Sequence, residues 1–310
     1  MAVTDPITVT GLDDSRYEFL PMSKRAPLQF SNGSAVAFYP IVLVEYYEEV
    51  PPEGAIVAGD VYGGLGGGGP LRRPQVTRVG NRDYGHRVGF FRLMKMFVEL
   101  GITPVIAIDA MAVERYPAIA SWITTHDVEV IAHGIAITRA ITSSMDVDEE
   151  ASYIAESKAR IESALSLTTK GWLGPTASES GRTLQLLVDA GFEYCLDWSN
   201  DEQPYYFGTA PALLSLPPFL ELSDNHAINQ RALYNESYSR ALVDAASRLA
   251  LDGRSSSRLL SFTLNTWTSG QPARSAYVRA ALQEIVAMPG VWRTTPGEVT
   301  SEMASLSGRR

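Results

Sequence analysis

The chain has 310 residues, of which 45% are hydrophobic and 20% are charged, and its formal net charge is -9. This composition is typical of a soluble globular protein of enzyme size, with one large α/β domain or two smaller ones. The acidic balance argues against nucleic acid as the main partner, because binding to phosphates needs a basic face. The single cysteine, Cys195, excludes an internal disulfide and argues against a metal site made of cysteines.

The start of the chain and its hydropathy bear on where the protein is located. A signal peptide would show a basic segment followed by an apolar run, and the N-terminus has neither. No stretch approaches the roughly 18 consecutive apolar residues that a membrane span needs. We therefore expect a cytoplasmic protein that acts on a small molecule and does not contact membranes.

The first part of the chain predicts an arm, a strand and a loop. Residues 1–33 are irregular and rich in proline, so we expect an arm that wraps a formed core. The apolar run Ala35–Val44 predicts the first strand. Residues 50–85 predict a long flexible loop, as a lid or an inter-subunit arm, with a glycine-rich stretch at 63–69. This stretch is not a phosphate loop, because no Gly-Lys-Ser/Thr follows it.

Hydrophobic periodicity predicts that strands and helices alternate along the rest of the chain. The predicted strands are 102–108, 128–132, 170–174, 192–196, 213–216 and 258–264. The predicted helices are 86–100, 111–125, 147–167, 180–190, 228–251 and 274–288, before a C-terminal segment. This alternation favours a parallel sheet with helices outside it, and about seven strands indicate a closed or nearly closed (β/α) barrel.

Polar and aromatic residues recur at the carboxyl ends of the predicted strands. They are Glu45, Asp109, His133, Trp172, Asp197 with Asn200, and Asn265 with Trp267. In a parallel barrel these ends meet at one mouth, where chemistry is usually built. The missing side chain of Gly134, after His133, would let backbone or substrate approach closely. Each residue also has a structural alternative, which is a satisfied core histidine for His133, simple exposure for Glu48 and Glu49, and core packing for the tryptophans.

Several motifs then carry a resemblance to a known family over residues 15–300. They are Arg82-Asp-Tyr-Gly-His-Arg-Val-Gly89, Ala132-His-Gly134, Gly171-Trp-Leu-Gly-Pro175, Asp197-Trp-Ser-Asn-Asp201, Ser269-Gly-Gln-Pro272 and Gly290-Val-Trp292. With the strand that ends in Val44-Glu45, they resemble the polysaccharide deacetylase-like proteins of the carbohydrate esterase 4 fold. The narrower resemblance is to the branch of the metal-independent allantoinase and related cyclic-amide hydrolases. It implies one distorted seven-stranded (β/α) barrel domain over 1–310, assembled as a homodimer or homotetramer.

The sequence departs from this family at two places that carry chemistry. Metal-dependent deacetylases use an aspartate after the first strand and a His-x-x-x-His pair. Here Glu45 and His133 match the first two positions, but Ile137 stands at the second histidine. Catalytic metals normally have three protein ligands, so we expect no cofactor unless a loop restores a ligand. A late histidine, the general acid in the family, is replaced by Asn265, which cannot exchange a proton near neutral pH.

The resemblance and the strand ends together lead us to expect a metal-independent hydrolase. Its reaction would open a non-peptide C–N bond in a small cyclic or linear amide, such as a ureide or an imide. We expect Glu45 or His133 as the base, and Asn265 with backbone N–H groups near Gly174 to hold the oxyanion. We expect substrate binding by Glu49, Arg87, Trp172, Gly174, Asp197, Trp198, Asn200 and Trp267.

Two alternatives stay open on the sequence alone. Ile137 and Asn265 remove two parts of the hydrolytic site while the mouth stays polar, which also fits a lyase or an isomerase. A catalytically silent binding protein is the other alternative. His86 and His226 would reach the mouth only from loops, and nothing in their spacing requires that they do.

Overall fold

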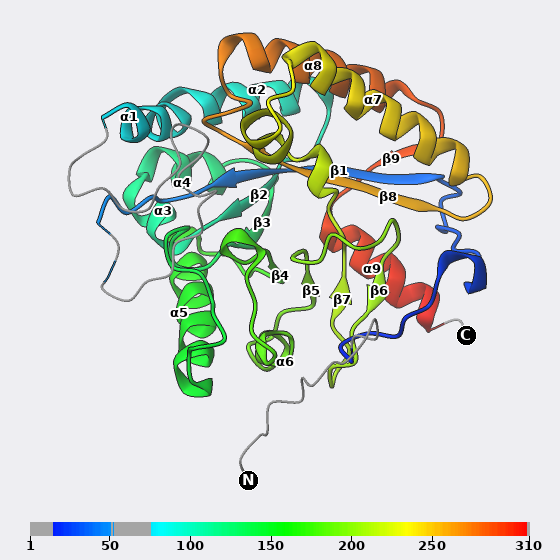
Figure 1. The fold of residues 1–310 in the computed structure, drawn as a ribbon, viewed down its shortest axis with the longest axis horizontal. Coiled ribbons are helices and arrows are strands. Elements are labelled where there is room, and N and C mark those ends of the chain that lie inside the picture. Colours follow the sequence, from blue (N-terminus) through cyan, green and yellow to red (C-terminus); the bar gives the residue numbers. More distant parts are fainter. Residues whose placement is uncertain (1–14, 51, 53–75, 309–310) are drawn as a thin grey trace.

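Helices and strands alternate along residues 15–50, 52 and 76–308, the part of the chain that the computed structural model describes. The glycine-rich stretch at 63–69 and most of the predicted lid lie outside these residues. The strands are β1 Val36–Val44, β2 Val105–Ile108, β3 Glu129–Ala132, β4 Gly171–Trp172, β5 Tyr194–Cys195, β6 Tyr205–Tyr206, β7 Leu214–Ser215, β8 Arg258–Asn265 and β9 Val291–Arg293. They form one curled sheet (Figure 1).

The sheet is an incompletely closed barrel with strand order β6-β7-β5-β4-β3-β2-β1-β8, and β9 pairs with β1. All pairs are parallel except β6 with β7. Two backbone hydrogen bonds link β8 to the segments before β6 and after β7. The Leu259 N–H donates to Glu202 at 2.8 Å, and the Phe219 N–H donates to Ser261 at 2.8 Å. The predicted distorted (β/α) barrel is thereby confirmed, with nine strands in the sheet instead of seven.

Helices cover the outside of this sheet. The α-helices are α1 Val76–Tyr84, α2 Phe90–Leu100, α3 Ala110–Arg115, α4 Pro117–Thr124, α5 Val147–Leu165, α6 Thr183–Asp189, α7 Asn235–Asp252, α8 Pro272–Ala287 and α9 Pro296–Ser307. The short helices are η1 Met22–Lys24, η3 Gly85–Gly89, η4 Pro175–Ala177, η5 Leu220–Leu222 and η6 Asn225–Gln230. Figure 1 shows α7 and α8 side by side along β8 and β1. Among the described residues, no helix combines the length and apolar character that crossing a bilayer requires.

Two predicted helices are wrong in extent because of local backbone signals. The predicted helix 111–125 is two helices, since Tyr116 leaves helical geometry and Pro117 starts a new first turn. The predicted helix 228–251 begins only at Asn235, because the π-helical turn η6 and a bend precede it.

Apart from short helices, the elements that were missed are helix α1, strands β6 and β9, and helix α9. Helix α1 lies within the predicted loop 50–85, and it is polar and interrupted by Gly80, so it has no apolar stripe to predict it. The C-terminal segment forms β9 and α9. Helix α9 starts with a capping box, in which the side chains of Thr295 and Glu298 each accept the other's backbone N–H. Pro296 stands at the first helical position, directly after Thr295.

The two faces of β1 pack into two different cores. Its inner residues Ala37, Tyr39, Ile41 and Leu43 lie inside the barrel, and its alternate residues pack against the helices. Burial on both faces explains the uninterrupted apolar sequence of this strand. The period of two places Glu45 on the inner face directly after Leu43. In the same way, His133 follows Ile131 in β3, and Asn265 follows Thr263 in β8.

Other segments pack at the amino ends of the strands, and the pocket lined by Glu45, His133 and Asn265 lies at the carboxyl ends. Phe30, Trp292 and Val299 pack into the inner core from the arm, β9 and α9. The arm is held by the Arg25 guanidinium, which donates to both carboxylate oxygens of Asp201 at 2.7 and 2.5 Å. The described part of the arm, residues 15–33, is therefore tied to the barrel through Phe30 and Arg25.

Glycines allow the start of α2 to approach the loop after β8. A methyl group on Gly89 would lie 2.0 Å from the carbonyl oxygen of Thr266, and one on Gly270 would lie 2.4 Å from the Gly89 Cα. This close approach brings α1 over the mouth of the barrel. There the guanidinium of Arg82 stacks 4.2 Å from the centre of the Trp267 ring.

We expect Gly89→Ala to lower the free energy of unfolding by about 1–3 kcal/mol, because the added methyl overpacks a backbone contact. The matched control is Gly80→Ala in α1, where nothing lies within 4 Å of an added methyl. That variant should gain roughly 0.5–1 kcal/mol from the better helix propensity of alanine. Urea unfolding of both variants measures the difference, and equal shifts would contradict the close approach.

Candidate active site

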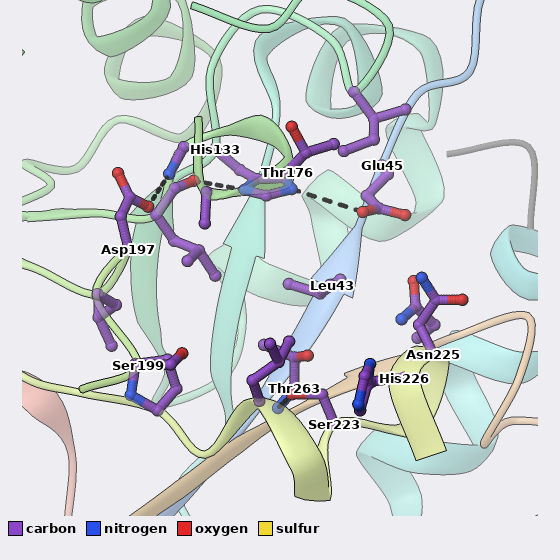
Figure 2. Close-up of a pocket in the computed structure, with 18 of the residues that line it drawn as sticks. Leu43, Glu45, His133, Thr176, Asp197, Ser199, Ser223, Asn225, His226 and Thr263 are labelled. Carbon is purple, nitrogen blue, oxygen red and sulfur yellow. Dashed lines mark hydrogen bonds and ion pairs between the residues drawn. The ribbon is translucent and has the colours of Figure 1, made fainter. Parts of the chain in front are cut away.

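The carboxyl ends of the strands open into a pocket of about 150 Å³ (Figure 2). This is about ten times the roughly 10–15 Å³ that one water molecule needs, so the pocket has room for a small ligand. The wall on the strand side consists of Leu43, Glu45, Arg82, His133, Ile137, Leu173, Gly174, Leu196, Asp197, Thr263, Asn265 and Trp267. The facing wall includes Pro218, Leu220, Ser223, Asn225, His226 and Gln230.

Glu45 lies between two cationic or potentially cationic groups. Its Oε2 accepts a hydrogen bond from Arg82 Nη1 at 2.9 Å, and its Oε1 lies 3.6 Å from His133 Nε2. Both Glu45 and His133 are buried, at 7% and 2% exposure. Burial alone raises the pKa of the Glu45 carboxyl, but His133 and Arg82 outweigh burial and hold this pKa below its ordinary value. Glu45 is therefore ionised at neutral pH.

The backbone fixes which nitrogen of His133 faces the pocket. His133 Nδ1 lies 2.5 Å from the carbonyl oxygen of Leu173, which can only accept. Nδ1 therefore carries a proton, and in the neutral ring Nε2 is the free acceptor. Figure 2 shows the ring of His133 with the Glu45 carboxylate on one side. The arrangement suits a general base whose protonated form is stabilised by a neighbouring carboxylate.

Gly134 shapes the backbone directly after His133. Its φ of +73° favours glycine, and an added methyl would lie 2.5 Å from the ring of Pro175 and from the hydroxyl of Tyr153. The Tyr153 hydroxyl in turn accepts the Ile135 N–H at 3.0 Å. The close approach that the sequence predicted at Gly134 is therefore made by protein groups, and it fixes the end of β3.

Asn265 is oriented by a buried carboxylate that the sequence analysis missed. Asp224 accepts from the Asn265 N–H at 2.8 Å, from its Nδ2 at 2.9 Å and from the Ser269 hydroxyl at 2.6 Å. Burial raises the pKa of Asp224 to about 6, although these hydrogen bonds favour its charged form. The amide of Asn265 keeps one N–H and its oxygen for other partners. Asp224 follows two prolines and the short helix η5, not a strand, so no pattern marked it.

Asp197 binds the backbone N–H of Gly174, which lies in the region expected to hold an oxyanion. The Gly174 N–H donates to Asp197 Oδ1 at 2.6 Å, so this N–H is not free to hold an oxyanion. Glu179 lies beside Asp197, and its Oε1 accepts from Trp198 Nε1 at 3.0 Å. Burial and then the charge of Asp197 raise the pKa of Glu179, which therefore keeps the proton of this pair.

Two groups of side chains bear on whether the described residues could hold a metal ion. In the first, Ile137 lines the pocket at the place of the missing histidine, and Arg82 already binds the Glu45 carboxylate. Two ligands and a neighbouring cation do not make a catalytic metal site. Among the described residues, only Glu179, Cys195 and Asp197 bring three possible ligand atoms within 4.8 Å of one another. Burial, and then the charges of Asp197 and Glu179, raise the pKa of the Cys195 thiol above its ordinary value.

The structure places five expected substrate-binding residues outside the pocket. Trp172 is fully buried in the outer core, because β4 alternates and turns the next residue, Leu173, inward. Trp198 packs against aromatic rings of the arm and the β6 segment, and Asn200 is exposed, where the Tyr205 hydroxyl donates to it. The Arg87 side chain is 77% exposed and pairs with Asp83, and Glu49 is exposed.

Other polar residues turn out to be structural, or enter the pocket from loops. The carboxylate of Asp109 accepts the N–H groups of Tyr46 and Ala112, at 2.6 and 2.7 Å, and so caps α3. His86 is buried and stacks on Tyr116, and burial with the charge of Arg82 lowers its pKa to about 4. His226, by contrast, lines the pocket from η6. No sequence pattern predicts this, because η6 has no regular period.

No protein-family model and no curated protein sequence matches the chain. Solved structures do match. PuuE allantoinase aligns with a TM-score of 0.80 and 20% identity over 95% of this chain and 98% of its own. A probable polysaccharide deacetylase from Pseudomonas aeruginosa PAO1 has a TM-score of 0.76 and 22% identity, over 88% and 92% of the two chains. A putative polysaccharide deacetylase from Mycobacterium smegmatis has a TM-score of 0.76 and 18% identity, over 91% and 95%.

Sequence identities this low show a shared fold only, and the alignments span nearly the whole of each chain. At the level of the fold the expectation is confirmed: the chain shares its fold with PuuE allantoinase and with these two polysaccharide deacetylases.

Proposed function

We propose that this protein hydrolyses a non-peptide C–N bond in a small cyclic or linear amide of the ureide or imide class. The observation that carries the proposal is the buried cluster of Glu45, His133 and Arg82 at the mouth of the barrel. The fold shared with PuuE allantoinase supports it, as does the small size of the pocket.

The base in this mechanism is the pair of His133 and Glu45. Water is held beside His133 Nε2, which takes a proton as the oxygen attacks the amide carbon. The imidazolium that forms lies 3.6 Å from the ionised Glu45 carboxylate, and this charge stabilises it. Arg82 keeps Glu45 ionised and in place through its hydrogen bond.

Asn265 is the donor to the oxyanion in this mechanism. One N–H of its amide is held by Asp224, which leaves the second N–H for a ligand in the pocket. A preorganised donor of this kind stabilises charge that develops only in the transition state. The apolar side chains of Leu43, Leu173 and Leu196 line the pocket beside it and strengthen such interactions by excluding water.

We expect Glu45→Gln and His133→Ala each to lower kcat by about 10²–10⁴ on a panel of cyclic ureides, imides and linear amides, because each removes part of the base. The matched control is Glu221→Gln, which neutralises an exposed carboxylate on η5 and should keep the wild-type rate. Circular dichroism checks that each variant is folded. Wild-type turnover by both site variants would rule out this assignment.

We predict that hydrolysis does not need a divalent metal, because Ile137 stands at the position of the second histidine and Arg82 binds the Glu45 carboxylate. Protein purified without chelator or affinity nickel should contain far less than one metal ion per chain by elemental mass spectrometry. Turnover should survive chelation. Near-stoichiometric metal with chelator-sensitive turnover would instead show that another residue completes a metal site.

A further inference from the structure

Hydrolysis of an amide needs an acid as well as a base, because an amine leaves poorly without a proton. Among the pocket residues, Asn265 cannot supply one, and the guanidinium of Arg82 does not give up a proton in proteins. Asp197 accepts the Gly174 N–H, and its neighbour Glu179 keeps the proton of that pair. Among the described residues that line the pocket, His226 is then the side chain that can exchange a proton and has no role so far.

We propose that His226 is the general acid that protonates the leaving nitrogen, with Gln230 as the residue that positions its ring. This inference rests on the proposed function. His226 Nδ1 lies 2.9 Å from Gln230 Oε1, so the ring donates to the amide oxygen through Nδ1. That contact leaves Nε2 as the nitrogen that can present its proton to a ligand. Figure 2 shows His226 on the opposite side of the pocket from His133.

The turn that carries His226 is anchored on both sides to the exit of β8. Asp224, two residues earlier, binds Asn265 and Ser269. Asn229, three residues later, donates through Nδ2 to the Thr268 hydroxyl at 2.9 Å. The position of His226 is therefore fixed relative to Asn265, the donor to the oxyanion, and does not depend on a free loop. Such anchoring is what a proton donor needs in order to meet the leaving group at hydrogen-bond distance.

The two imidazoles then divide the proton transfers of one turnover. His133 takes a proton from water as the new C–O bond forms. The C–N bond breaks as His226 gives its Nε2 proton to the nitrogen, which leaves as a neutral amine or amide. Solvent takes up the extra proton of His133 and gives a proton back to His226, so each turnover consumes one water molecule and no other reactant.

The test compares leaving groups in the variant His226→Gln. With hydantoin or another cyclic ureide or imide that the wild type opens, we expect kcat to fall by about 10²–10⁴ and KM to change little. With a p-nitrophenyl ester, whose phenolate leaves without a proton, the fall should be less than about tenfold. A histidine that only binds substrate or supports the fold would lower both rates alike.

Two further variants sharpen the comparison. His126→Gln changes an exposed histidine that stacks on Trp122 in α4 and should leave both rates unchanged. Gln230→Ala should lower amide turnover, and Gln230→Glu, which keeps an acceptor for Nδ1, should retain more of it. Amide hydrolysis that His226→Gln retains at the wild-type rate would overturn this inference alone. A wild-type protein that opens no amide would overturn the proposed function, and the role of His226 with it.

Discussion

The buried ion pair between Glu45 and Arg82 is the interaction on which the mouth of the barrel depends. Taking both charges out of water is unfavourable, and such a pair is stable only when its geometry is good and other partners satisfy it. Here the guanidinium bonds the carboxylate at 2.9 Å and stacks on the ring of Trp267. The pair joins the end of β1 to α1, and the contact between Gly89 and Gly270 determines where α1 lies. Loss of one partner would leave the other charge buried, at a cost of about 3–5 kcal/mol.

A second buried carboxylate, Asp224, organises the other half of the pocket. It binds the backbone and side chain of Asn265 together with Ser269, and so fastens the start of η6 to the exit of β8. Its raised pKa shows that the fold tolerates an unfavourable burial at this position. The folded state binds this proton more tightly than the unfolded chain, so stability is lost as pH rises from about 4 through about 6. The contacts of Asp224 fix the positions of Asn265 and of the turn that carries His226 in the proposed site.

The sequence predicts the part of the site that regular strands carry. Alternation along β1, β3 and β8 projects Glu45, His133 and Asn265 inward, and barrel geometry gathers them. The same alternation, applied to β4, would have turned Trp172 outward, so that error was avoidable. Asp224 and His226 were beyond reach, because their places depend on contacts with a strand that lies roughly 40 residues away in sequence. Helix α1 was missed for a related reason, since contacts with the loop after β8 hold it and an apolar stripe does not.

Ile137 and Asn265, which stand where the family has histidines, have related consequences in the proposed mechanism. With Ile137 in place of the second histidine, the proposed mechanism uses no metal, and the guanidinium of Arg82 supplies the positive charge beside Glu45. A guanidinium holds its proton and offers directional donors, so it fixes a carboxylate but does not activate water as a metal does. In the proposed mechanism His133 therefore activates the water. The proton for the leaving group has to come from a residue outside β8, because Asn265 at the end of this strand cannot supply it. A polar turn fastened to that strand by Asp224 and Asn229 meets this need, because it brings a histidine to the pocket without occupying the position that holds the oxyanion.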